Sequence, residues 1–216
     1  DKNNIILIPD DSPYCTVLLG GADEFVQNTS ISQEGDTLYI ETPRSNSHLH
    51  INMKNIWVNG KRRPPDLGED FGYIKIKCKG LESLYVNGTG TGEVYSQVPI
   101  CELKAKIKGS TSIDAIQTKN IAAEISGSGD ISITELNGNL RGRISGSGSI
   151  AVLNGEINDL DVTVSGSGSL IVGATVNTAS LILSGSGEMF VAHVLEEYIE
   201  QRTGSGSIRV LRKGRL

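Results

Sequence analysis

The chain has 216 residues, enough to bury a sizeable core as one long domain or two short ones. Its net charge of -5 and its pI near 5.3 argue against a nucleic-acid-binding protein, which presents a basic face. Only 5% of the residues are aromatic, so platforms for stacking bases are not expected either. No apolar run approaches the roughly 20 residues that span a bilayer, so we expect no membrane insertion by this chain. The chain begins with Asp1 and not Met, as expected if a signal segment was removed or the chain was trimmed.

The first 70 residues contain short stretches typical of β-strands. Clusters of Gly, Asn, Asp and Pro separate five apolar stretches, at 4–8, 16–19, 37–42, 49–53 and 56–58. The segment GKRRPPDLGED, residues 60–70, is the strongest candidate for a mobile loop. We predict that residues 1–70 form irregular rungs and a cap, and that residues 71–216 continue the same domain as a regular β-helix.

A repeat with a period near 19 residues dominates the rest of the chain. Variants of Ser-Gly-Ser-Gly recur, and the first Gly of each copy stands at positions 90, 109, 127, 146, 166, 185 and 204. Apolar and polar residues alternate between the motifs, which is the period of a β-strand. An extended unit of this length buries its apolar side only by stacking on a copy of itself, about 4.8 Å away. The sequence therefore predicts an all-β fold, a single-stranded parallel β-helix (solenoid), with right-handed winding favoured over left-handed.

The glycines of the motif continue the inward-facing track of Ile and Val. An inward position that accepts only hydrogen indicates a constriction, where the backbone lies against the opposite wall or φ is positive. A flexible linker does not fit, because the flanking residues are typical of a core. We expect this structural role for Gly127, Gly129, Gly146, Gly148, Gly166, Gly168, Gly185, Gly187, Gly204 and Gly206.

The serines of the motif have the opposite parity and are predicted to face outward. A regular surface of hydroxyls suits docking of a glycan or ordering of water. The alternative, which we favour, is that small polar residues are what a tight outer bend tolerates. The candidate recognition surface consists of Ser126, Ser128, Ser145, Ser147, Ser165, Ser167, Ser184 and Ser186.

No residues have the spacing of a metal or disulfide framework. His48 and His50 share one strand face but lack a third ligand, and His193 stands alone. The cysteines are widely spaced and odd in number, so we expect three buried thiols, with one disulfide and one free thiol as the alternative: Cys15, Cys78 and Cys101.

Catalysis and cofactor binding are not expected either. Pectin-degrading β-helices act through carboxylates and basic residues clustered on one outer face, whereas here such residues are scattered: Asp130, Glu156 and Asp161, with Arg141 and Arg143 among them. The stretch GTGTGEV resembles a phosphate-binding loop, but strands flank it and no helix follows.

The C-terminal end departs from the repeat. Tyr198, Glu200 and Arg202 occupy the inward track, which indicates a bulge, a short helical turn, or pairing of Glu200 with Arg202 at a wet end. The tail RVLRKGRL is locally basic, and we interpret it as a charged edge that discourages end-to-end stacking.

These repeats also resemble a known family. The stretches ISGSGDISI, ISGSGSIAV and VSGSGSLIV, at about 19-residue spacing, are similar to the Gly-rich auto-transporter adhesin head GIN domain. The upstream DEFVQNTSISQEGDTLYIET and GYIKIKCKGLESLYVNGTGTGEV resemble the family's early strands, so the likeness covers roughly residues 17–213. It departs at YIEQR, where the family tends towards a Val-x-x-x-Ile strand.

The resemblance implies an exported β-helical protein of the bacterial cell envelope, in the periplasm or at the cell surface, and supplies no catalytic residues. Together with the scattered charges it favours a non-catalytic adhesin or interaction module that binds a glycan or a protein. A carbohydrate-active β-helix enzyme and a purely structural spacer are the alternatives. Three or more carboxylates and a cation converging in one groove would favour the enzyme, and a smooth rod without pockets would favour the binding module.

Overall fold

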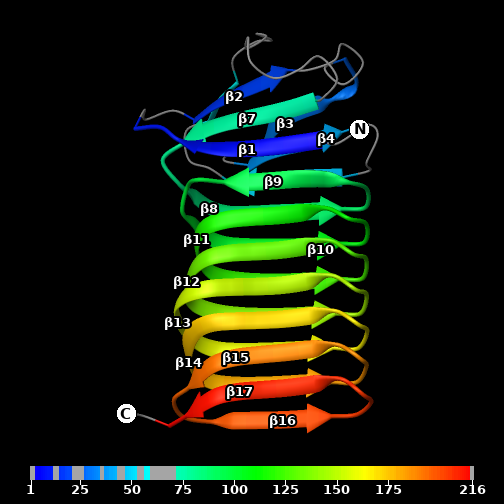
Figure 1. Ribbon diagram of the computed structural model, residues 1–216. Helices are drawn as coiled ribbons and strands as arrows, with labels where there is room; N and C mark the ends of the chain where they lie inside the picture. The colour runs from blue at the N-terminus through cyan, green and yellow to red at the C-terminus, as the bar shows by residue number, and fades with distance from the viewer. Residues whose placement is uncertain are drawn as a thin grey trace.

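The computed structural model is a tall stack of flattened β-coils (Figure 1). It describes residues 3–11, 15–20, 27–34, 37–42, 47–52, 56–58 and 72–214. The strands in chain order are β1 (Asn3–Pro9), β2 (Cys15–Gly20), β3 (Ser30–Glu34), β4 (Thr37–Thr42), β5 (Ser47–Asn52), β6 (Ile56–Val58), β7 (Gly72–Cys78), β8 (Leu81–Gly88), β9 (Gly92–Ser96), β10 (Ile100–Ile107), β11 (Ser112–Ile125), β12 (Asp130–Ile144), β13 (Ser149–Val164), β14 (Ser169–Leu183), β15 (Glu188–Val194), β16 (Tyr198–Arg202) and β17 (Ser207–Lys213). The predicted all-β solenoid with a repeat of about 19 residues is confirmed. In the described ranges, no helix is long and apolar enough to cross a membrane.

Each long strand of the repeat bends near its middle and so contributes to two facing parallel sheets. The half before the bend lies in the front sheet, with β9, β15 and β17. The half after the bend lies in the back sheet, with β8, β10 and β16. Equivalent residues pair from coil to coil, so that Ile113, Ile131, Ile150 and Leu170 form one column.

The coils wind with a right hand. In Figure 1 the front strand β9 runs to the left, β10 behind it runs to the right, and the chain descends. This is the hand that a right-twisted strand favours in a parallel crossover.

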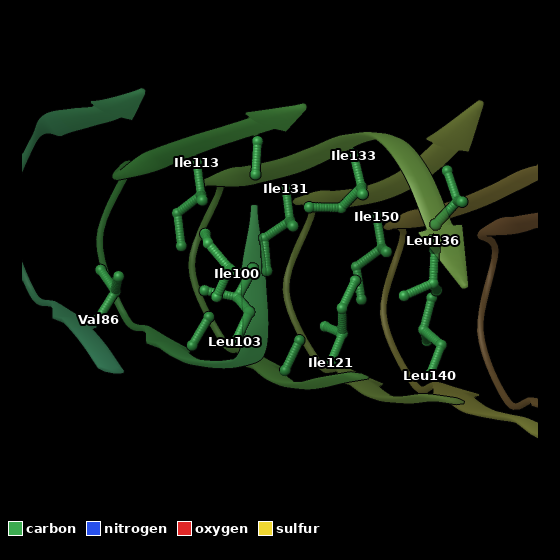
Figure 2. Close-up of a cluster of buried hydrophobic side chains, with 14 of the residues drawn as sticks. Val86, Ile100, Leu103, Ile113, Ile121, Ile131, Ile133, Leu136, Leu140 and Ile150 are labelled. Carbon is green, nitrogen blue, oxygen red and sulfur yellow. The ribbon is translucent and has the colours of Figure 1, made fainter. Parts of the chain in front are cut away.

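The core is a dry layer of aliphatic side chains between the two sheets. Figure 2 shows side chains from the opposed strands pointing towards one another. Ile131 and Ile133 in front, Leu140 behind and Leu136 at the bend are all fully buried. Because each coil repeats the same inward positions, the layer continues along the stack, and it accounts for the burial of apolar surface that stabilises the fold.

The bend of β13 between the two sheets requires glycine at position 155. Gly155 has a φ of 118°, a left-handed conformation that residues with a Cβ rarely adopt. An added Cβ there would also overlap with the carbonyl oxygen of Leu136 in the preceding coil. The turn signal LNGE in the sequence therefore marks a corner of the coil.

The N-terminal strands close one end of the stack in a mixed arrangement. β1 lies between β7 and β9 in the front sheet and is parallel to both. β2 runs antiparallel to β7, and the meander β3–β4–β5 extends the back sheet through an antiparallel pairing of β5 with β8. The proposed boundary at residue 70 stays a prediction, and the predicted mobile loop 60–70 lies outside the described residues.

Candidate functional site

The Ser-Gly-Ser-Gly motifs form the turns along one edge of the stack, at the right in Figure 1. These turns are hydrogen-bonded to one another through their backbones. The N–H of Ser147 donates to the carbonyl oxygen of Gly127 at 3.0 Å, and the N–H of Ser167 donates to that of Gly146 at 3.1 Å. The inter-coil ladder therefore continues through the motif, and the turns are not slack loops.

The motif glycines lie where the backbones of successive turns approach most closely. A Cβ added to Gly146 would overlap with the carbonyl oxygen of Gly127, and one added to Gly148 would overlap with that of Gly129. The crowding thus comes from the preceding coil, whereas the sequence suggested the opposite wall or a positive φ. Of the ten predicted glycines, only Gly204 has a φ in the left-handed region, at 103°. Their contribution to stability stays a prediction.

All eight serines of the candidate recognition surface are exposed on this edge, and we call them the serine column: Ser126, Ser128, Ser145, Ser147, Ser165, Ser167, Ser184 and Ser186. In the described part of the chain, one of these hydroxyls has a hydrogen-bond partner, since Ser186 Oγ lies 3.0 Å from Ser205 Oγ. The other seven hydroxyls lie on exposed residues and have no partner among the residues that the structure describes, which is what a recognition surface needs.

Polar side chains next to the turns are, in contrast, engaged between coils. Asp130 accepts the backbone N–H of Ser149 at 2.9 Å and its hydroxyl at 2.6 Å. At the opposite corner, Asn139 donates to Asn120 Oδ1 at 3.2 Å and accepts the backbone N–H of Asp159 at 3.3 Å. These side-chain hydrogen bonds link successive coils. Of the serine column, only Ser186 makes such a bond among the described residues.

A second candidate site lies on the outer face of the back sheet. A hollow of about 460 Å³ opens there across β8 and β10–β13, and we call it the basic hollow. Its floor is Ala122, a small outward residue that pairs in register with Lys104 in the coil before and with Arg141 in the coil after. The hollow exists because long side chains flank a methyl group.

Four cationic side chains and two carboxylates line the basic hollow: Lys104, Lys106, Arg141 and Arg143, with Glu124 and Asp161. Lys106 pairs with Glu124 at 3.3 Å, and Lys104 pairs with Glu102, outside the lining, at 3.3 Å. Arg141 and Arg143 are exposed and form no ion pair within the described residues. The hollow is therefore net basic on an acidic protein.

Arg141 and Arg143 look like scattered charges in the sequence, but the fold groups them with Tyr85, Lys104 and Ala122. The signal was present in the spacing, because the repeat places Lys104, Ala122 and Arg141 in one column. The basic hollow meets neither of the two criteria given above, one that would favour an enzyme and one that would favour a binding module. It holds two carboxylates and not three, and the stack is not free of pockets.

The histidines and cysteines show no metal-binding geometry in the part of the chain that the structure describes, where no three His, Cys, Asp or Glu gather as a metal site. The side chains of His48, His50 and Cys15 lie outside that part. Cys78 is buried, but the expectation of three buried thiols is wrong for Cys101, which is exposed. The alternation slips here, because Cys101 and Glu102 are both exposed between the buried Ile100 and Leu103.

The C-terminal end carries polar residues where the preceding coils have apolar ones. Tyr198 is half-buried on β16, its hydroxyl donates to Glu200, and Lys213 Nζ lies 4.0 Å from its ring centre. Burial, followed by the bond and charge of Glu200, raises the pKa of Tyr198 above its usual range. Arg202 donates to the carbonyl oxygen of Gly206 at 3.1 Å, so the predicted pairing of Glu200 with Arg202 is replaced by bonds to other groups. Tyr198–Arg202 is a strand, which excludes a helical turn there.

The fold and the two surfaces define a class: a right-handed parallel β-solenoid with an aliphatic core and two polar surfaces on its outside. The sequence profile of one family, described as "Putative auto-transporter adhesin, head GIN domain", matches residues 4–194. The chain belongs to this family. A comparison with curated proteins and one with solved structures each found no match.

Proposed function

We propose that this chain is a non-catalytic interaction module of the bacterial cell envelope, exported to the periplasm or the cell surface, where it binds a glycan or a protein. The family description, which names an adhesin head domain, supports a role in attachment. A rigid solenoid suits that role, because stacked coils present the same side chains at regular intervals along an extended surface.

The observation that carries this proposal is the serine column. Seven of its eight hydroxyls have no partner in the described ranges of the chain, and they belong to turns whose backbones are fixed by inter-coil hydrogen bonds. A preorganised set of donors and acceptors loses little conformational entropy on binding, so each hydrogen bond to a sugar hydroxyl or a peptide group contributes more to affinity.

A glycan and protein array probed with the full chain tests the proposal. The variant Ser145→Ala/Ser147→Ala/Ser165→Ala/Ser167→Ala removes four exposed hydroxyls that no protein group engages, so it is expected to fold normally and lose binding. The matched control Ser132→Ala/Ser180→Ala removes hydroxyls from the sheet faces and is expected to bind as the parent does. Equal binding by the parent, the variant and the control would show that the serine column is not the binding surface. No binding to any array component would favour the alternative of a purely structural spacer.

The enzyme alternative has a separate readout. Reducing-end and viscosity assays on acidic and neutral polysaccharides are expected to show no turnover. Turnover that is lost in Glu124→Gln or Asp161→Asn would assign the basic hollow to catalysis and overturn the non-catalytic part of the proposal.

A further inference from the structure

We propose that the basic hollow binds a linear polysaccharide that carries carboxylate groups, laid along the axis of the stack over β10–β13. This site lies on the back sheet, away from the serine column, and it shares with the proposed function only the assumption that the domain binds a partner.

The charge of the lining selects an anion. Arg141 and Arg143 are exposed and have no carboxylate within ion-pair distance among the described residues, so binding a ligand anion does not require an existing pair to break. A guanidinium presents its N–H groups in a fork that matches a carboxylate, with two parallel hydrogen bonds. Lys106 is held by Glu124, but this pair is about half exposed, so water and ligand oxygens reach it readily.

The carboxylates of the lining argue for a ligand that carries hydrogen-bond donors beside its anions. Glu124 and Asp161 stand beside the cations and would repel duplex DNA, whose backbone presents a phosphate at every unit and no hydroxyl. A uronic acid ring instead carries one carboxylate and several hydroxyls. Its hydroxyls can donate to Glu124 and Asp161 while its carboxylate accepts from Arg141 or Arg143.

The spacing along the stack suits a chain of sugar rings. Lys104 and Arg141 belong to alternate coils with Ala122 between them, so their backbones are separated by about 10 Å, two strand spacings. A pyranose ring in an extended glycan advances by nearly one strand spacing, so a chain along the axis would place successive rings over successive coils. Ala122 leaves room for a ring, and Tyr85 lines the β8 end of the hollow.

The test measures binding of polygalacturonate oligomers to the full chain by calorimetry at low salt. We expect the double variant Arg141→Gln/Arg143→Gln to weaken binding about tenfold or more, because each guanidinium contributes charge-assisted hydrogen bonds. Ala122→Gln keeps the charge and fills the floor, and it is expected to weaken binding as well. Arg209→Gln removes one exposed cation from the front sheet and is the matched control, with binding unchanged.

An uncharged form of the polysaccharide serves as a control for the ligand. Fully methyl-esterified polygalacturonate keeps the chain but not the charge and is expected to bind far more weakly. Equal affinity for the esterified polymer, no affinity for the acidic one, or tighter binding of duplex DNA or anionic vesicles would each overturn the proposal. Binding of a neutral glycan or a protein that depends on the serine column would leave the proposed function standing while this inference fails.

Discussion

At the residue scale, one atom explains why the motif requires glycine. This atom is the carbonyl oxygen of the equivalent turn in the preceding coil. The oxygen of Gly127 accepts the N–H of Ser147 and is also the atom that a Cβ on Gly146 would strike. A side chain at position 146 therefore either overlaps with that oxygen or pushes the two turns apart and breaks the hydrogen bond. The same close contact recurs in each coil of the repeat, which is why the sequence motif recurs in each coil.

Gly146→Val is expected to lower the free energy of unfolding by about 3 kcal/mol, through overpacking and the loss of an inter-coil hydrogen bond. Urea unfolding followed by circular dichroism measures the change. Ser147→Ala in the same turn keeps the backbone N–H and removes an exposed hydroxyl, so it should unfold within about 0.5 kcal/mol of the parent. If Gly146→Val melted within a degree or two of the parent, the steric account of the motif would be wrong.

Thr118 is a polar residue in the aliphatic core. It is fully buried at the bend of β11, pairs in register with Ile100 and Leu136, and its Oγ1 has no hydrogen-bond partner in the part of the chain that the structure describes. Replacing a buried, unbonded hydroxyl by a methyl group of the same shape removes a desolvation cost.

Thr118→Val is therefore expected to raise the free energy of unfolding by about 1 kcal/mol. The same urea titration measures it, and Thr163→Val, a partly buried threonine on the outer face of the back sheet, serves as the control with little change. A loss of stability in Thr118→Val would show that its hydroxyl makes a bond that the core requires.

At the element scale, the strands were predictable where alternation holds and not where it slips. The inward positions Ile131, Ile133, Leu140 and Ile150 follow from a period of two, and all are fully buried. At the bends an extra residue shifts the register, as between Thr118 and Asn120, and parity no longer tells inside from outside. Cys101 lies where the alternation slips, exposed next to the exposed Glu102. The basic hollow was missed because it depends on which residues of separate coils become neighbours.

The edge strand β16 replaces apolar core contacts with a polar cluster of Tyr198, Glu200 and Lys213. Because the native environment raises the pKa of Tyr198, the native state holds that proton more tightly than the unfolded chain. The contribution to stability is thus fully present below the usual tyrosine pKa of about 10 and is lost as the pH rises above it.

Between pH 9 and pH 11 the free energy of unfolding of the parent is expected to fall more steeply than that of Tyr198→Phe, which has no phenol to ionise at this position. Urea titrations of both proteins at the two pH values measure the difference, and the other tyrosines and lysines cancel in the comparison. Glu200→Gln keeps an acceptor for the hydroxyl without the charge, so its slope should lie between the two. Identical slopes for parent and Tyr198→Phe would show that the cluster does not hold the phenol in its neutral form.

At the scale of the whole molecule, the repeat specifies the stack but not its N-terminal end. Intervals of 18 to 20 residues between motif glycines predict parallel coils because only stacking buries the apolar track. The first strands carry the same alternation, yet β2 and β5 pair antiparallel with β7 and β8. Alternation says which face of a strand is buried and nothing about the direction of its neighbour, so the cap could not be derived in the same way.

If the stability of the stack is the sum of contributions from each coil and from its contacts with neighbouring coils, one whole coil can be removed without unfolding the rest. Deleting residues 166–184 joins Ser165 to Gly185, which takes the place of Gly166 in the motif, and leaves the residues of the basic hollow in the chain. The shortened protein is expected to fold with the same strand content, to be shorter by about 4.8 Å in solution scattering, and to lose about 1–3 kcal/mol of stability. Deleting residues 166–174 removes about half a coil, so the residues that follow no longer pair with their equivalents in the preceding coil, and this variant is expected not to fold. Equal stability of the two deletions would contradict the stacking account, because loss of register would then cost no more than loss of a coil.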